Sequence, residues 1–125
     1  MDARKFLENY GRAWETRDAE LAASLFAPQA DYWETPFGKP LAGREAIRAY
    51  WQAATATQEE IHFAPGDFLI VGQTLVAEWR CTYRHRPRRS PAVAGERREL
   101  RGILLAEFRG ELVRSFREYW HRRTL

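Results

Sequence analysis

The sequence contains little cysteine and little histidine. Its one cysteine, Cys81, cannot form an internal disulfide, and the paired Cys and His spacings of a zinc site are absent. The three histidines (His62, His85 and His121) are scattered, with no pair at helical i, i+4 spacing. Because a transition metal needs converging ligands, no metal site is expected. We interpret Cys81 as a buried structural thiol, since free cysteine behaves as a small apolar side chain.

Long apolar runs are also absent. No stretch reaches the length of a membrane span, and the N-terminal residues contain no apolar signal core. These absences predict a cytoplasmic protein with no membrane partner. The chain has no glycine-rich phosphate loop and no Ser/His/Asp nucleophile elbow, and we expect no cofactor.

Aromatic residues are plentiful, with seven Phe, five Trp and five Tyr in 125 residues. Hydrophobic residues make up 45% of the chain and charged residues 30%, as in an ordinary globular protein. The length fits a single domain, residues 1–125, that can bury a real core. The aromatic area exceeds the need of a minimal core, which predicts an aromatic-lined cavity or a subunit interface.

The charge balance is mildly basic. The net charge is +3, from 20 basic and 17 acidic side chains, so a dedicated nucleic-acid binder is not expected. The strongest cluster runs from Arg84 to Arg98, where prolines and small residues predict a long loop. It is either a patch for acidic ligands or nucleic-acid phosphate, or a solvated loop. It contains no aromatic ring on which a base would stack.

The first half of the chain has helical periodicity. Apolar residues at helical spacing predict a helix over about residues 3–15. Asp18 is placed to cap a second, short helix whose apolar face extends to Phe26. A short strand is expected at residues 31–35, followed by a loop and a third helix that begins near Arg44.

From about Ile61 the apolar period changes to two, as in strands. A break at Pro65-Gly66 predicts a bulge, and Gly72-Gln73 and Gly110-Glu111 predict hairpin turns. The expected strands cover residues 61–71, 74–85, 98–108 and 112–120. Helices, one early strand, a third helix and a four-strand meander predict an α+β domain, with the helices on one face of a curved antiparallel sheet.

The last of these strands carries a carboxylate where an apolar residue is expected. Alternate residues of a strand share a face, so Glu118 lies between Phe116 and Trp120. A carboxylate in apolar surroundings pairs with a cation, keeps its proton at a raised pKa, or lines a solvent-filled pocket. The candidate cations are Arg80, Arg101 and Arg114. The other two alternatives make Glu118 a site residue.

Several stretches match a known pattern when they are taken together. They are Phe6–Trp14, Asp18, Leu25–Ala30, Pro36-Phe37 and Gly43–Trp51. These residues and the closing strand resemble the nuclear transport factor 2-like superfamily, in its SnoaL-like and ketosteroid-isomerase-like branch. The resemblance implies a cone-shaped fold, in which a curved antiparallel sheet of one short strand and a four-strand meander packs against three helices and encloses a cavity. Homodimers are usual in this family.

The resemblance also implies catalytic positions. In ketosteroid isomerases a tyrosine on the first helix stabilises the developing oxyanion, and an acid on the first strand removes a proton. Tyr10 and Glu34 align with these two positions, and Leu104 stands where those enzymes hold a second acid. Because Leu104 is apolar, a steroid-isomerase activity is not favoured.

The same comparison points the last strand into the cavity, with Glu118 as an additional acid. The expected catalytic residues are therefore Glu34, Glu118 and Tyr10. The residues expected to contact a ligand are Trp14, Trp51, Trp79, Leu104, Phe116 and Trp120. Each has a purely structural alternative: Glu34 in an ion pair with an arginine, and Tyr10 and the tryptophans in the core.

The sequence is compatible with three functions. The first is a small-molecule-binding SnoaL-like protein, a candidate isomerase, cyclase or hydrolase that works without a cofactor, with an apolar or aromatic molecule in its cavity. The second is a non-catalytic ligand-binding or dimerisation module whose exposed sheet face forms a homodimer. The third is nucleic-acid binding through the Arg84–Arg98 loop, which is the least favoured.

Overall fold

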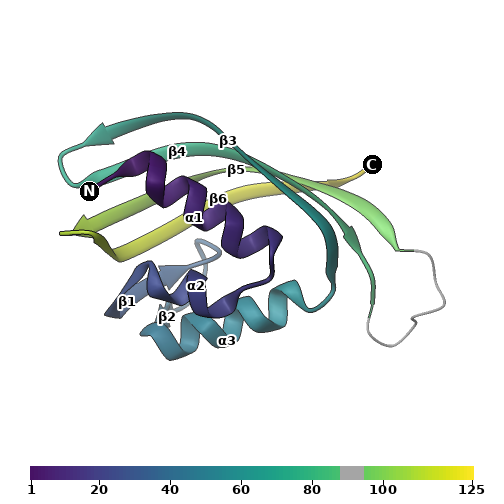
Figure 1. Ribbon diagram of the computed structural model, residues 1–125, viewed down its shortest axis with the longest axis horizontal. Coiled ribbons are helices and arrows are strands. Elements are labelled where there is room, and N and C mark those ends of the chain that lie inside the picture. The colour runs from purple at the N-terminus through teal and green to yellow at the C-terminus, as the bar shows by residue number, and fades with distance from the viewer. Residues whose placement is uncertain (88–94) are drawn as a thin grey trace.

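The computed structural model describes residues 1–87 and 95–125, which form three helices and one six-stranded sheet (Figure 1). The helices are α1 (Ala3–Glu15), α2 (Ala19–Ser24) and α3 (Arg44–Thr55). The strands are β1 (Phe26–Trp33), β2 (Leu41–Ala42), β3 (Gln58–Val71), β4 (Thr74–His85), β5 (Glu96–Arg109) and β6 (Leu112–Thr124). The predicted α+β class and its curved sheet with helices are confirmed.

The helices form where periodicity and capping predict them. In α1 the buried residues, among them Phe6, Tyr10 and Trp14, lie on one face, and the Asp2 carboxylate accepts a hydrogen bond from the backbone N–H of Lys5. Asp18 caps α2 in the same way, as expected. These caps satisfy backbone donors that the first helical turn leaves without partners.

The second helix ends earlier than predicted. It stops at Ser24, and Phe26 begins β1 instead of extending the apolar face of α2. The reason is a long-range contact: the backbone N–H of Val113 donates to the carbonyl of Leu25 at 3.0 Å, and Phe26 pairs with Val113 in the sheet. Pairing with a distant strand therefore overrides the local helical pattern at this point.

The strand order in the sheet is β2-β1-β6-β5-β4-β3. The antiparallel expectation holds for four of the five pairings, but β1 runs parallel to β6. Strand β2 is a two-residue element inside a segment predicted to be loop. The sheet is thus mixed, and β1 and β6, the first and last strands in chain order, lie side by side (Figure 1).

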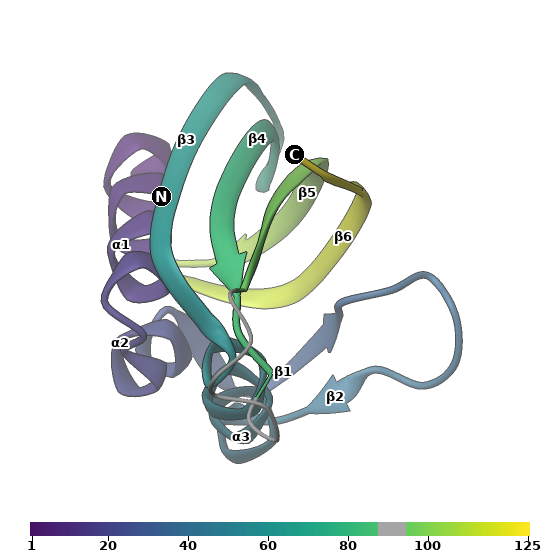
Figure 2. The ribbon, with the colours of Figure 1, turned by 90° about the vertical axis from the view of Figure 1, so that its right-hand side faces the viewer.

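The sheet curves strongly, and the segment between β1 and β2 projects from it (Figure 2). The predicted break in β3 is present, since the pairing register with β4 shifts between Pro65 and Phe68. Both predicted hairpins have two-residue turns, in which Gly72 and Gly110 have φ values of +62° and +64°. Glycine adopts these left-handed angles without a steric penalty.

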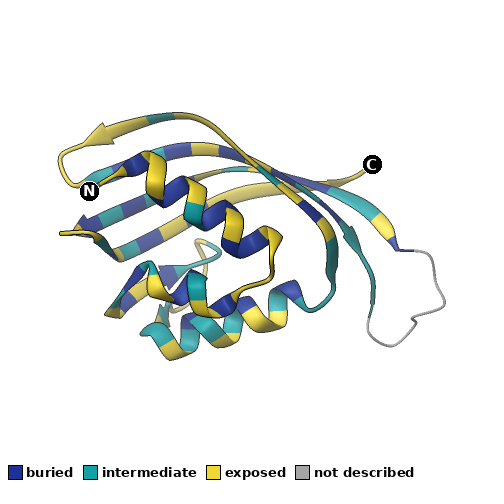
Figure 3. Ribbon diagram, viewed as in Figure 1, coloured by how far each residue is buried: buried dark blue, intermediate teal, exposed yellow. Residues whose placement is uncertain are grey.

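One face of the sheet packs against the helices and forms the core. Buried positions alternate with exposed ones along β4 and along much of β5 and β6 (Figure 3). We call the helix-facing side the inner face and the opposite side the outer face. The inner face contributes Leu75, Leu104 and Phe116, all fully buried, to a core rich in aromatic rings.

Three further sequence predictions concern membrane-spanning helices, the Arg84–Arg98 loop and the burial of Cys81. No helix among the described residues is long and apolar enough to cross a membrane. The predicted Arg84–Arg98 loop is described only at its two ends, because residues 88–94 lie outside the described residues. Cys81 is fully buried, as expected.

Candidate functional site

The carboxyl group of Glu118 is buried on the inner face of β6. Its side chain is only 5% exposed, and the hydroxyl of Tyr32 donates a hydrogen bond to its Oε1 at 2.9 Å. Burial raises the pKa of Glu118 from 4.5 to about 7, against the lowering effect of hydrogen bonds with Tyr32 and Tyr10, and the charge of Glu34 raises it further. Glu118 is therefore balanced between its acid and base forms at neutral pH.

Three tyrosines from three different elements surround this carboxyl group: Tyr10 of α1, Tyr32 of β1 and Tyr50 of α3. Burial raises the pKa of all three hydroxyls, and the charge of Glu118 raises them again. The phenols consequently keep their protons and act as hydrogen-bond donors. Tyr32 is held in place by stacking on Phe116, with 4.7 Å between the ring centroids.

Glu118 and these tyrosines line a small cavity of about 130 Å³ between the inner face and the helices, here called the inner cavity. Its remaining wall is formed by residues of α1, α3 and the strands, namely Trp14, Trp51, Ala54, Thr55, Gln58, Trp79, Tyr83, Leu100 and Trp120. The cavity has the volume of about four liquid water molecules.

Two indole groups in this wall lack a hydrogen-bond partner. The Nε1 atoms of Trp51 and Trp79 are buried and have no acceptor among the residues that the structure describes. The neighbouring indole of Trp14, by contrast, donates to Oε1 of Gln58 at 2.7 Å. A buried N–H without an acceptor is costly, and such groups in native proteins call for an explanation such as a bound water or ligand.

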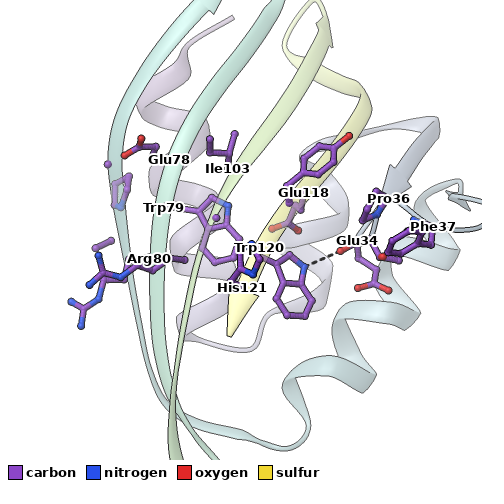
Figure 4. A pocket seen from close by; sticks show the side chains of 17 residues that line it. Glu34, Pro36, Phe37, Glu78, Trp79, Arg80, Ile103, Glu118, Trp120 and His121 are labelled. Carbon is purple, nitrogen blue, oxygen red and sulfur yellow. Dashed lines mark hydrogen bonds between the residues drawn. The ribbon is translucent and has the colours of Figure 1, made fainter. Parts of the chain in front are cut away.

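A second, larger depression of about 860 Å³ borders the same part of the sheet, and we call it the outer groove (Figure 4). It shares Trp79, Glu118 and Trp120 with the inner cavity. Glu34 lies at its edge, where the Nε1 of Trp120 donates to the backbone carbonyl of Glu34 at 2.9 Å. This hydrogen bond joins the end of β1 to β6 next to the buried carboxyl group.

The structure distributes the sequence-predicted residues over three places. The residues at the inner cavity are Tyr10, Trp14, Trp51, Trp79, Glu118 and Trp120. Glu34 is at the outer groove, and Leu104 and Phe116 are fully buried in the core next to Glu118. Aromatic rings and a carboxyl group thus converge at one cavity, while Glu34 approaches it from another side.

Among the described residues, neither of the two acids pairs with an arginine. Glu118 has no ion-pair partner among residues 1–87 and 95–125, because Arg80 and Arg101 contact Glu99 and Arg114 contacts Glu107. Glu34 likewise forms no ion pair within the described part of the chain. Nor do three or more His, Cys, Asp or Glu side chains of the described residues gather in a way that would hold a metal ion.

Tyr32 and Tyr50 are site residues that sequence reasoning missed. Tyr32 shares a strand face with Ala30 and Glu34, and this alternation was the available signal. Tyr50 lies at helical spacing with Ile47 and Ala54 on the apolar face of α3, a pattern that predicts only a core position. In the structure it lines the inner cavity, and its ring lies 5.7 Å from that of Tyr32 between centroids.

Comparison with known proteins assigns the family. The model of the SnoaL-like domain matches residues 4–116, so the chain belongs to the SnoaL-like family. No curated protein sequence matches it. The fold is also that of solved structures related to nuclear transport factor 2 and ketosteroid isomerase, as the sequence resemblance implies.

Three of these solved structures illustrate the range. A putative SnoaL-like polyketide cyclase from a Jannaschia species is 11% identical, with a TM-score of 0.77 over 93% of this chain and 83% of that one. An LEH-like epoxide hydrolase of Mycobacterium tuberculosis is 11% identical, with a TM-score of 0.72 over 94% and 80%. A protein of Catenulispora acidiphila with a ketosteroid-isomerase-like fold, solved with trimethylamine, is 20% identical, with a TM-score of 0.73 over 91% and 83%. At these identities the likeness concerns the fold alone.

Proposed function

We propose that this protein is an enzyme that binds a small carbonyl compound in the inner cavity and transfers a proton by means of Glu118. The observation that carries this proposal is a buried carboxyl group with a pKa of about 7 that accepts a hydrogen bond from a tyrosine and contacts no cation among the described residues. A general base or acid works best when its pKa lies near the working pH. A carboxylate kept only for stability is typically paired with a cation.

The reaction begins with the deprotonated form of Glu118. Its carboxylate removes a proton from the carbon next to the carbonyl group. The electron pair of that C–H bond forms a C=C bond, and the π pair of the C=O bond moves to the oxygen. A hydroxyl from Tyr50 or Tyr10 stabilises the oxyanion that forms. The protonated Glu118 then returns the proton to the same carbon, which exchanges or epimerises that position, or to the γ-carbon of a β,γ-unsaturated substrate, which completes an isomerisation. No step requires a cofactor.

The three tyrosines and Glu34 have different roles in this proposal. Tyr32 donates to Glu118 and orients its carboxyl group, and Tyr10 lines the same cavity beside them. Tyr50 is the better candidate for the oxyanion, because it lines the cavity and its hydroxyl forms no side-chain hydrogen bond with another described residue. Glu34 acts through its charge, which raises the pKa of Glu118.

The size and polarity of the cavity restrict the substrate. A volume of about 130 Å³ admits a ketone or aldehyde of a few carbons. The free N–H groups of Trp51 and Trp79 favour a ligand with a hydrogen-bond acceptor, which the carbonyl oxygen provides. The apolar walls, including Trp14 and Trp120, favour a substrate that is otherwise uncharged.

The Glu118 carboxylate also suits two related reactions. It would serve a cyclase by deprotonating carbon and a hydrolase by deprotonating water, and solved structures with both descriptions share the fold.

Hydrogen exchange at carbon provides the direct test. The protein is incubated with cyclopentanone in D₂O, and loss of the α-proton signal is followed by ¹H NMR. Wild type is expected to accelerate the exchange, with a rate that rises with pH and levels off above about 7, because only the carboxylate is a base. Glu118→Gln is expected to lose about 100-fold or more of this acceleration.

The matched control is Glu107→Gln, which removes a carboxylate that is paired with Arg114 and does not line the inner cavity. It should exchange cyclopentanone at the wild-type rate. Equal rates for wild type and Glu118→Gln, or no acceleration by wild type over buffer, would contradict the proposal.

Homodimerisation is a second proposal, favoured by a separate observation. Leu69, Ile70 and Val71 are consecutive and 68%, 52% and 67% exposed at the end of β3, the edge strand of the sheet. An apolar edge of this kind promotes association. Light scattering after size exclusion should give twice the chain mass for wild type and the single-chain mass for Ile70→Lys. A monomeric wild type would refute the dimer.

A further inference from the structure

A cluster of arginines surrounds one carboxylate on the outer face of the sheet. Glu99 is 1% exposed because guanidinium groups cover it: Arg80 and Arg101 contact its Oε2, the latter at 3.4 Å, and the Nε of Arg123 donates to its Oε1. The three arginines are themselves 50%, 65% and 66% exposed. Three positive charges and one negative charge leave this cluster with a net charge of +2.

The sheet register forces these charges together. Arg80 of β4 pairs with Arg101 of β5, which in turn pairs with His121 of β6, so three basic side chains form one row across the sheet. Like charges directly opposite each other on neighbouring strands destabilise a sheet. Glu99 offsets this repulsion only in part, since a single carboxylate serves three guanidinium groups. An additional anion at this row would reduce the remaining repulsion.

The outer groove connects this row to an apolar region. Arg80, Arg101 and His121 line the groove, and the next row of the outer face presents Ile103 and Tyr119, which are 40% and 46% exposed. The groove thus has a basic part and an apolar part side by side.

The far lip of the groove is apolar as well. It is formed by Pro36 and by Phe37, whose side chain is 79% exposed (Figure 4). A volume of about 860 Å³ lies in the range of sites that accept drug-sized molecules, unlike that of the inner cavity. An exposed aromatic residue next to a basic row suits a ligand with both an apolar body and an anionic end.

We propose that the outer groove binds an amphiphilic carboxylate, with its anionic head on Arg80 and Arg101 and its apolar body along Ile103 toward Phe37. The guanidinium group is planar and carries five N–H donors, which match the two oxygens of a carboxylate. Arg101 directs one nitrogen to Glu99 from 3.4 Å and retains further donors. This site goes beyond the proton-transfer function, because it needs neither the inner cavity nor ionisation of Glu118.

Three carboxylates line the groove, and one of them gives the proposal a charge test of opposite sign. Unlike Glu34 and Glu118, Glu78 lies opposite Ile103 on the outer face, one row from the arginines. Its charge repels a carboxylate ligand while Arg101 attracts it. Neutralising Glu78 must therefore strengthen binding and neutralising Arg101 must weaken it, whereas a ligand held only by apolar contact responds to neither.

The experiment is calorimetric titration with 2-naphthoate and with its uncharged analogue 2-naphthamide, at about pH 7.5 where the acid is ionised. Wild type is expected to bind the carboxylate about ten-fold more tightly than the amide, or better, the difference of one charge-assisted hydrogen bond. Arg101→Gln is expected to remove this preference, and Glu78→Gln to lower the Kd of the carboxylate. Arg101→Gln should fold, since Glu99 keeps Arg80 and Arg123.

Arg114→Gln is the matched control, because Arg114 is a half-exposed arginine of β6 that pairs with Glu107 and does not line the groove. It should bind 2-naphthoate as wild type does. Equal affinity of wild type for acid and amide, or an unchanged Kd in Arg101→Gln, would overturn the proposal. Because these substitutions leave Glu118 and its tyrosines untouched, either result leaves the α-proton exchange test unaffected.

Discussion

Leu104 of β5 and Glu118 of β6 lie directly opposite each other on the inner face of the sheet. Leu104 is fully buried, whereas Glu118 borders the inner cavity. The family resemblance aligns Leu104 with the second acid of ketosteroid isomerases. On that alignment, the carboxyl group of this chain lies one strand away at the same level of the sheet, about 5 Å from the position of that acid.

The first prediction concerns stability against pH. The folded-state pKa of Glu118 is about 7 and its ordinary value is 4.5, so unfolding releases a proton between these values. Stability from this group is fully present below about pH 4.5 and is lost as the pH rises through 7, by about 3 kcal/mol. In urea unfolding at about pH 4 and pH 8, wild type should lose this amount relative to Glu118→Gln. A constant difference between the two proteins would contradict burial of an ionisable carboxyl group.

A second prediction concerns the free indole groups. Cyclopentanone at saturating concentration should shift the indole N–H signals of Trp51 and Trp79 in ¹H–¹⁵N spectra, because its oxygen supplies their missing acceptor. The indole signal of Trp14 should move less, since that group already donates to Gln58. Substitution of Trp79 by Phe assigns its signal. Equal small shifts for all the tryptophans would place the ketone elsewhere.

The third prediction concerns the Tyr32 hydroxyl. Tyr32→Phe removes a hydrogen bond to a buried carboxyl group, so the free energy of unfolding should fall by about 1–3 kcal/mol. The pKa of Glu118 should rise further, because that hydrogen bond lowers it. Tyr119→Phe, at a tyrosine that is 46% exposed on the outer face, is the matched control. If both variants behave alike, Tyr32 does not orient Glu118.

A fourth prediction concerns Glu99. Hydrogen bonding with Arg80, then with Arg123 and Arg101, holds the pKa of Glu99 down at about 2. Its contribution to stability is present above the ordinary 4.5 and is lost as the pH falls toward 2. Glu99→Gln should lower the Tm at neutral pH, with a gap to wild type that narrows in acid. A gap that stays constant down to about pH 2 would show that the arginines do not depend on the Glu99 charge.

Much of the fold was predictable because it depends on local sequence patterns. Asp18 capping, the β3 break at Pro65 and the turns at Gly72 and Gly110 each depend on a few neighbouring residues. The start of β1 was not predictable in this way. Phe26 leaves the helical pattern because Val113, far along the chain, pairs with it. No pattern among the neighbouring residues indicates that Val113 is the partner of Phe26.

The site residues also divide into those that a local pattern predicts and those that depend on a distant partner. The position of Glu118 between two aromatic residues predicted a buried acid, because strand alternation is local. The partner of that acid was not predictable, since Tyr32 reaches Glu118 only through the parallel pairing of β1 with β6. For the same reason two of the candidate arginines for Glu118, Arg80 and Arg101, contact Glu99 instead, and the third, Arg114, contacts Glu107: the register of β4, β5 and β6 decides which carboxylate each of them meets.

The central claim is that Glu118 changes its ionisation near neutrality, and a titration of its side chain tests this most directly. The carboxyl carbon is followed by ¹³C NMR in protein labelled at glutamate, with Glu118→Gln used to assign the signal. The account predicts a midpoint near pH 7 that belongs to Glu118. A midpoint near the ordinary 4.5 would contradict it, because the carboxylate would then be too weak a base for the proposed proton transfer.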